Sequence, residues 1–164
     1  MQAEIITIGD ELLIGQVVDT NSTWLGRTLG EDGIKVTQIT SVQDDADQIA
    51  RAVNEALARV SIVLVTGGLG PTRDDITKHT LAELFGMRLV RDEQVYETVR
   101  RQLAVRGIAF NELNRGQALV PDGCTVLPNR NGTAPGMWFE RGGKILVSMP
   151  GVPFEMKALV TDEV

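Results

Sequence analysis

The chain has 164 residues, of which 43% are hydrophobic, 23% charged and 4% aromatic, and its net charge is −6. This length and balance fit one domain whose core is built from aliphatic side chains. The acidic charge and the lack of a basic run exclude a broad DNA- or RNA-binding surface, because such a surface needs clustered Lys and Arg. Cys124 is the one cysteine, which excludes an internal disulfide and a cysteine-based zinc cluster.

The N-terminus and the hydropathy of the chain indicate a cytoplasmic protein without membrane contact. The opening residues, MQAEIITIGDELL, lack the basic region of a signal peptide. No uninterrupted apolar run approaches the length needed to span a bilayer.

Short strands and helices alternate in the first half of the chain. The patterns predict strands over 3–8, 34–42 and 62–65, with a helix carrying Trp24, Leu25 and Leu29 after the first of them. Helices are also expected over 44–60 and about 74–85, and Asp45 with Gln48 resembles a capping pair. Such alternation predicts a parallel sheet covered by helices on both faces.

The second half is less regular. A short strand is expected over 87–90 and a helix over 92–106, whereas the composition of 110–121 indicates an irregular surface segment. After a short strand at 125–127, the runs 137–139 and 144–148 flank Arg-Gly-Gly and predict a β-hairpin. Pro153 suits the first turn of a final helix.

The stretch 61–77 combines a buried strand, a glycine-rich turn and two acids. Glycines let the backbone approach a ligand closely, and successive N–H groups of such a turn can face an anion. Asp74 and Asp75 follow, which indicates a metal ion between these carboxylates and a ligand phosphate. The pattern also fits a turn that needs glycine only for its geometry, with one of the two acids as a helix N-cap.

Asp10, Asp44 and Asp75 each follow a different predicted strand. Because the carboxyl ends of parallel strands meet at one edge of a sheet, we expect these carboxylates to converge there. Converging carboxylates favour a hard divalent cation, which can polarise a phosphoryl oxygen and activate a bound water. Each Asp is also a preferred N-cap residue, and the two roles are compatible.

Four motifs, at 9–21, 66–77, 131–136 and 149–156, resemble the N-terminal domain of the competence/damage-inducible protein CinA, part of the molybdopterin-binding superfamily of MogA and MoaB. The resemblance implies an α/β fold with three layers, α/β/α, a mostly parallel mixed sheet and a C-terminal β-hairpin. It implies an ADP-ribose pyrophosphatase that forms AMP and ribose 5-phosphate with Mg, Mn or Co, and a homo-oligomer, since relatives commonly self-associate.

The resemblance also assigns roles to residues. Asp44 and Asp75 match the catalytic aspartates of the molybdopterin relatives, and with Asp10 they are the expected metal ligands. Leu69 stands where those relatives carry threonine, which disfavours adenylyl transfer to a pterin. The expected substrate- and phosphate-binding residues are Thr66, Gly67, Gly68, Leu69, Gly70, Arg73, Asn21, Gly132, Thr133, Pro150 and Gly151.

Residues 1–164 are expected to form a single domain. CinA proteins usually continue into a nicotinamide-nucleotide amidase domain, which this sequence lacks, so we expect a part of a longer protein or a protein without that activity. Two alternatives to the hydrolase are a molybdopterin-binding or adenylyl-transferring domain and a non-catalytic nucleotide-binding module of a longer CinA-like protein.

Overall fold

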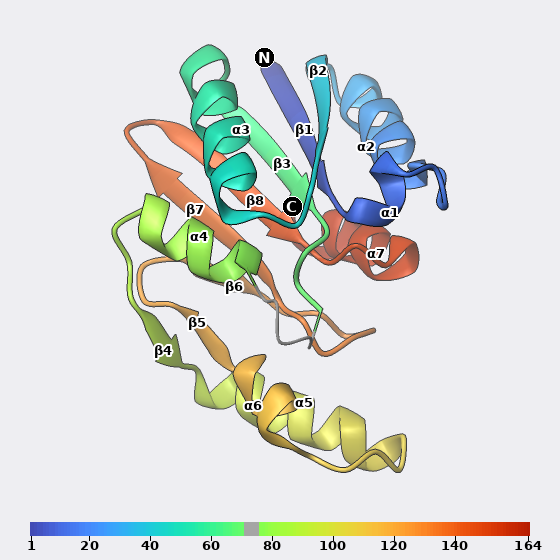
Figure 1. Cartoon of the computed structure of the whole chain (residues 1–164), viewed down its shortest axis with the longest axis vertical. Coiled ribbons are helices and arrows are strands. Elements are labelled where there is room, and N and C mark those ends of the chain that lie inside the picture. The colour runs from blue at the N-terminus through green and yellow to red at the C-terminus, as the bar shows by residue number, and fades with distance from the viewer. Residues whose placement is uncertain (71–75) are drawn as a thin grey trace.

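A six-stranded sheet forms the centre of the computed structural model, which describes residues 1–70 and 76–164 (Figure 1). The strand order is β2-β1-β3-β8-β7-β6; the first four strands are parallel to one another, and β7 is antiparallel to both β8 and β6. The strands are β1 (Gln2–Ile8), β2 (Lys35–Val42), β3 (Ile62–Thr66), β6 (Thr125–Leu127), β7 (Gly136–Arg141) and β8 (Lys144–Met149).

Helices cover both faces of this sheet. Alternate residues of a strand point to opposite faces, so Ile6 and Ile8 pack with α3 (Ala46–Arg59) and α4 (Ile76–Leu84). Ala3 and Ile5 pack on the other face with α2 (Thr20–Glu31) and α7 (Pro153–Glu163). The expected three layers, the mostly parallel mixed sheet and the β7–β8 hairpin are confirmed (Figure 1).

A small lobe extends from one end of the sheet and has a core of its own (Figure 1). It comprises β4 (Leu89–Arg91), α5 (Glu93–Val105), α6 (Glu112–Gly116) and β5 (Leu119–Pro121), and β4 pairs antiparallel with β5. The expectation that 110–121 is irregular is therefore wrong. The side chain of Asn111 caps α6 by accepting from the N–H of Asn114, and β5 is held by a partner strand that lies far from it in the sequence.

The predicted capping pair at the start of α3 is half present. Asp45 accepts a hydrogen bond from the N–H of Gln48 at 3.0 Å, but the Gln48 side chain donates to Gln43 instead of returning to Asp45. In the described part of the chain, no helix has the length and apolar character needed to cross a membrane.

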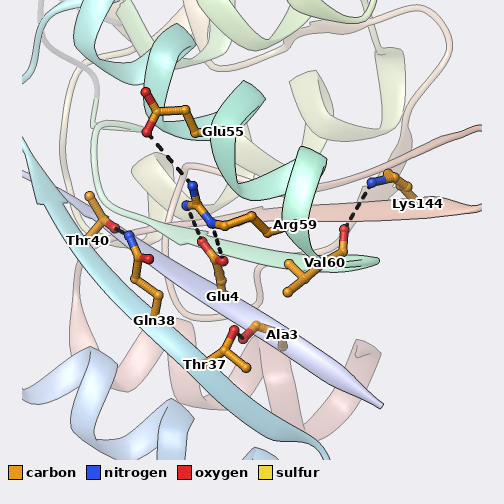
Figure 2. A network of polar contacts seen from close by, with 9 residues as sticks. All are labelled: Ala3, Glu4, Thr37, Gln38, Thr40, Glu55, Arg59, Val60 and Lys144. Atoms are coloured by element: carbon orange, nitrogen blue, oxygen red, sulfur yellow. Dashed lines mark hydrogen bonds and ion pairs between the residues drawn. The ribbon is translucent and has the colours of Figure 1, made fainter.

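A partly buried ion pair joins α3 to the sheet near the amino ends of the strands (Figure 2). Glu4 on β1 is 2% exposed, and each of its carboxylate oxygens accepts a hydrogen bond from Arg59 at 2.8 Å. Hydrogen bonding to Glu4 raises the pKa of Arg59. Lys144 donates to the carbonyl oxygens of Leu57 and Val60 at the end of the same helix.

Candidate functional site

A cleft of about 440 Å³ lies at the carboxyl edge of the sheet, where β1 and β3 end. The chain leaves β1 toward β2 on one side and later returns to β3 on the other side, so this edge is the point where the strand order reverses. Ligands of open α/β sheets bind at such points. The walls are formed by residues 7–8, 11–12, 17–21, 66–70 and 151–153.

The glycine loop after β3 approaches its neighbours too closely to carry side chains. Gly67 and Gly68 have φ values of +106° and +67°, which L residues with side chains rarely adopt. A Cβ atom on Gly67 would overlap the carbonyl oxygen of Ile8, and one on Gly68 would overlap the hydroxyl of Thr77. The Gly67 N–H donates to the carbonyl of Met149 at 3.0 Å. Gly67 and Gly68 line the cleft, so the wall that they contribute is backbone rather than side chain, as in a phosphate-binding turn.

Leu69 anchors this loop instead of offering a side chain to a ligand. It is 4% exposed and packs in the core with Ala134 and Met137. Its carbonyl accepts a hydrogen bond from the buried Gln117 at 3.5 Å. The predicted role of Leu69 in binding is thus limited to its backbone, because its side chain points away from the cleft into the protein.

Four of the predicted binding residues form one hydrogen-bonded network beside the loop. The Asn21 side-chain amide donates to the hydroxyl of Thr66 at 3.1 Å and to the carbonyl of Gly151 at 2.8 Å. The Thr66 hydroxyl in turn donates to the carbonyl of Pro150 at 3.0 Å. The network ties the first turn of α2 to the ends of β3 and β8. Because both amide donors of Asn21 are used, its main role is to hold the cleft wall in place.

Asp10 contacts Asp44, and these are the two residues of the predicted carboxylate group that the structure describes. A carboxylate oxygen of Asp10 accepts a hydrogen bond from the backbone N–H of Asp44 at 3.3 Å. The N-cap of α3 is Asp45 and that of α1 (Asp10–Leu13) is Gly9, so capping does not account for Asp10 or Asp44. Asp10 directly precedes Glu11, which lines the cleft.

Of the three predicted metal ligands, Asp10 and Asp44 lie within the described residues. Asp75 and Arg73, predicted as a metal ligand and a phosphate-binding residue, lie outside them. The part of the chain that is described holds no cluster of three or more His, Cys, Asp or Glu able to bind a metal ion. The carboxylates of Asp10 and Asp44 nevertheless have the oxygen donors that Mg²⁺ and Mn²⁺ prefer.

Gly132 and Thr133 are not brought into the cleft. They line a separate hollow of about 170 Å³ between α5 and the segment 128–135. The buried Asn129, which the sequence did not single out, shapes this segment by accepting from the N–H groups of residues 131 and 132 and donating to Ala134 and Glu155. A side chain on Gly132 would overlap Glu155, so this glycine serves packing.

The cleft lining combines acidic side chains with the positive end of a helix dipole. Its charged side chains, among the described lining residues, are the acids Glu11 and Asp19. Asp19 caps α2 through the N–H of Ser22 at 2.9 Å. The start of α7, at Val152 and Pro153, opens on the cleft without a side-chain cap, so the positive end of that helix dipole is available to a ligand.

Comparison with known proteins identifies relatives along the whole chain. A family profile described as "Probable molybdopterin binding domain" matches residues 4–164. A CinA-like protein from Cytophaga hutchinsonii is 52% identical over 98% of this chain and 38% of its own length. A putative competence-damage inducible protein from Caldicellulosiruptor bescii is 44% identical over all of this chain and 40% of its own length. The chain thus spans about two fifths of these curated relatives.

Solved structures give the same result for the fold. The molybdopterin biosynthesis enzyme MoaB of Thermus thermophilus matches with a TM-score of 0.63 at 19% identity, covering 97% of this chain and 86% of its own. A CinA protein of unknown function from Thermoplasma acidophilum matches with a TM-score of 0.89 at 37% identity, covering 98% of this chain and 94% of its own. The chain therefore has the MogA/MoaB-like fold and belongs to the probable molybdopterin-binding domain family, as a domain of the CinA type.

Proposed function

We propose that the cleft binds a phosphorylated small molecule of the molybdopterin class, with its phosphate against the glycine loop at 67–70. The observation that carries this proposal is the pair of consecutive positive-φ glycines, Gly67 and Gly68, which line the cleft beside the uncapped start of α7. Backbone amides and a helix N-terminus together favour an anion. The names of the structural neighbours, which include molybdopterin biosynthesis proteins, agree with this ligand class.

A divalent cation completes the site in this proposal. The charged residues described in the cleft lining, Glu11 and Asp19, repel a phosphate, so a bound cation is needed to offset them. Asp10 and Asp44 would hold Mg²⁺, Mn²⁺ or Co²⁺, together with Asp75. When bound, the cation would supply charge neutralisation at the phosphate and a more acidic water. The protein's own part is to hold the Asp10 carboxylate against the backbone of Asp44 and to present the loop backbone.

A second candidate function is hydrolysis of ADP-ribose. In that reaction one water is consumed and the phosphoanhydride bond is broken, which yields AMP and ribose 5-phosphate. The contact between Asp10 and the backbone of Asp44 favours it, since neither acid serves as a helix N-cap and Asp10 directly precedes Glu11 in the cleft lining. Adenylyl transfer to a pterin and binding without turnover are the remaining possibilities for the same cleft.

Calorimetry and product analysis on the purified chain separate these functions. Molybdopterin and ADP-ribose are titrated with and without Mn²⁺, and AMP is measured by chromatography. We expect cation-dependent binding that is weakened at least roughly ten-fold in Asp44→Asn, the loss of one charge-assisted interaction. Asp47→Asn, an exposed acid on α3, is the matched control and should bind as the wild type does.

The outcomes lead to different conclusions. AMP formation that Asp44→Asn abolishes establishes the hydrolase, and an adenylylated pterin formed from ATP establishes the transferase. Binding of molybdopterin without turnover of either substrate establishes the binding domain. No binding of any phosphorylated ligand, with or without Mn²⁺, contradicts the proposal.

A further inference from the structure

Apolar side chains are exposed at the mouth of the cleft, where the fold does not require them. Val17 and Val18, in the segment after α1, are 53% and 79% exposed, and Val152 before α7 is 42% exposed. All three line the cleft, and none belongs to a hydrophobic core cluster of the described chain. We call these three valines and Pro153 the apolar lip.

The lip is held in place by the backbone. The N–H groups of Gln16 and Val17 both donate to the carbonyl of Glu11, at 3.0 and 3.3 Å, and the N–H of Thr20 donates to the carbonyl of Val18 at 2.8 Å. Pro153 and the first turn of α7 fix the opposite wall. Figure 1 shows α1 with its following segment lying near α7. Rigid presentation of apolar side chains lowers the entropy lost when a ligand binds.

We propose that the apolar lip binds the planar heterocycle of the ligand, an adenine or pterin ring, while the glycine loop holds its phosphate. This inference rests on the proposed function and adds which part of the molecule selects the ligand. It assigns Val17, Val18 and Val152 as specificity-determining residues. Simple phosphates and sugar phosphates would fill only the inner part of the cleft.

Shape and charge favour a ring as the occupant of the lip. The valines stand on two walls of a concave cleft whose volume is within the range of roughly 300–1,000 Å³ typical of small-molecule sites. The lip itself is uncharged, whereas Glu11 and Asp19 lie in the same lining. A neutral ring therefore fits between the walls, and a second anionic group at this place would be repelled.

The test compares ligands with and without a ring against a lip variant. AMP, ribose 5-phosphate and pyrophosphate are titrated calorimetrically at one fixed Mn²⁺ concentration into the wild type and into Val18→Thr. This substitution keeps the shape of the side chain and replaces one methyl group by a hydroxyl. Val105→Thr is the matched control, because Val105 is 84% exposed at the end of α5, away from the cleft.

We expect the wild type to bind AMP more tightly than ribose 5-phosphate. Val18→Thr should weaken AMP binding roughly three- to ten-fold, the value of a buried methyl group or slightly more, and leave the other two ligands unchanged. Val105→Thr should bind all three ligands as the wild type does.

Three results would overturn the inference while leaving the proposed function intact, and the first two concern binding. One is phosphate binding with no preference for AMP, and the other is equal weakening of all three ligands in Val18→Thr. A change in sedimentation coefficient in Val18→Thr would also overturn it, since the lip would then contact a second copy of the chain. If no phosphorylated ligand binds to the wild type, the proposed function fails as well.

Discussion

Replacing Gly67 by alanine is expected to damage the cleft more than the same change at any other turn with positive φ. At φ +106° the backbone of an L residue with a side chain is strained by about 1–2 kcal/mol. The added Cβ atom would also overlap the carbonyl oxygen of Ile8. That oxygen cannot move freely, because Ile8 is the last residue of β1, which is paired with β2 on one side and β3 on the other.

The two costs together predict a loss of about 3–5 kcal/mol in the free energy of unfolding, a large share of the stability of a typical domain. Gly142→Ala is the control, since Gly142 has φ +59° in the β7–β8 turn and open space around its Cβ position. It should cost about 1 kcal/mol. Urea unfolding followed by circular dichroism measures both variants. Equal destabilisation by the two substitutions would refute the argument that close backbone approach fixes glycine at position 67.

Three further predictions concern the packing of Leu69, the ion pair between Glu4 and Arg59, and the thiol of Cys124. Leu69→Thr should lower the free energy of unfolding by about 2–4 kcal/mol, because it removes a buried aliphatic side chain and buries a hydroxyl. Urea unfolding measures this, and an unchanged free energy of unfolding would contradict the prediction. Glu4→Gln should lower the thermal midpoint clearly more than Glu55→Gln, since Glu4 is buried in its pair with Arg59 whereas Glu55 is exposed at 4.0 Å from the same guanidinium; equal shifts would contradict this. Burial raises the pKa of Cys124 from 9.0 to about 11, so the unfolded thiol loses its proton at lower pH than the folded one; stability should therefore fall as pH rises from about 9 to 11, and a Cys124→Ala variant with the same fall would show that another group causes it.

Periodicity and turn chemistry suffice to predict the parts of the fold that local sequence determines. Helix α3 is an example, because apolar residues at three- and four-residue spacing follow a capping Asp45. The short elements α6 and β5 could not be predicted this way. Only a few residues long, they depend on the cap at Asn111 and on pairing with β4, which is remote in sequence.

Some residues of the candidate site could likewise be placed from the sequence, and others could not. Topology alone brings Asp10 and Asp44 together, since both follow parallel strands that end at one edge. By contrast, a motif such as 131–136 identifies residues without saying where they lie, and the structure places Gly132 in a separate hollow. The position of Val17 and Val18 in the cleft lining could not be predicted from periodicity, because apolar residues in a loop give no periodic signal, although their place between β1 and α2 indicates the carboxyl edge.

A titration followed by ¹H–¹⁵N NMR tests the central claim most directly. A phosphorylated ligand, AMP with Mg²⁺, is added to the ¹⁵N-labelled chain, whose mass of 17.8 kDa suits this method. The account predicts that the largest amide shifts fall on Gly68 and Gly70, with smaller ones at the start of α7. Shifts centred instead on Gly132 and Thr133, or absent from the glycine loop, would contradict it.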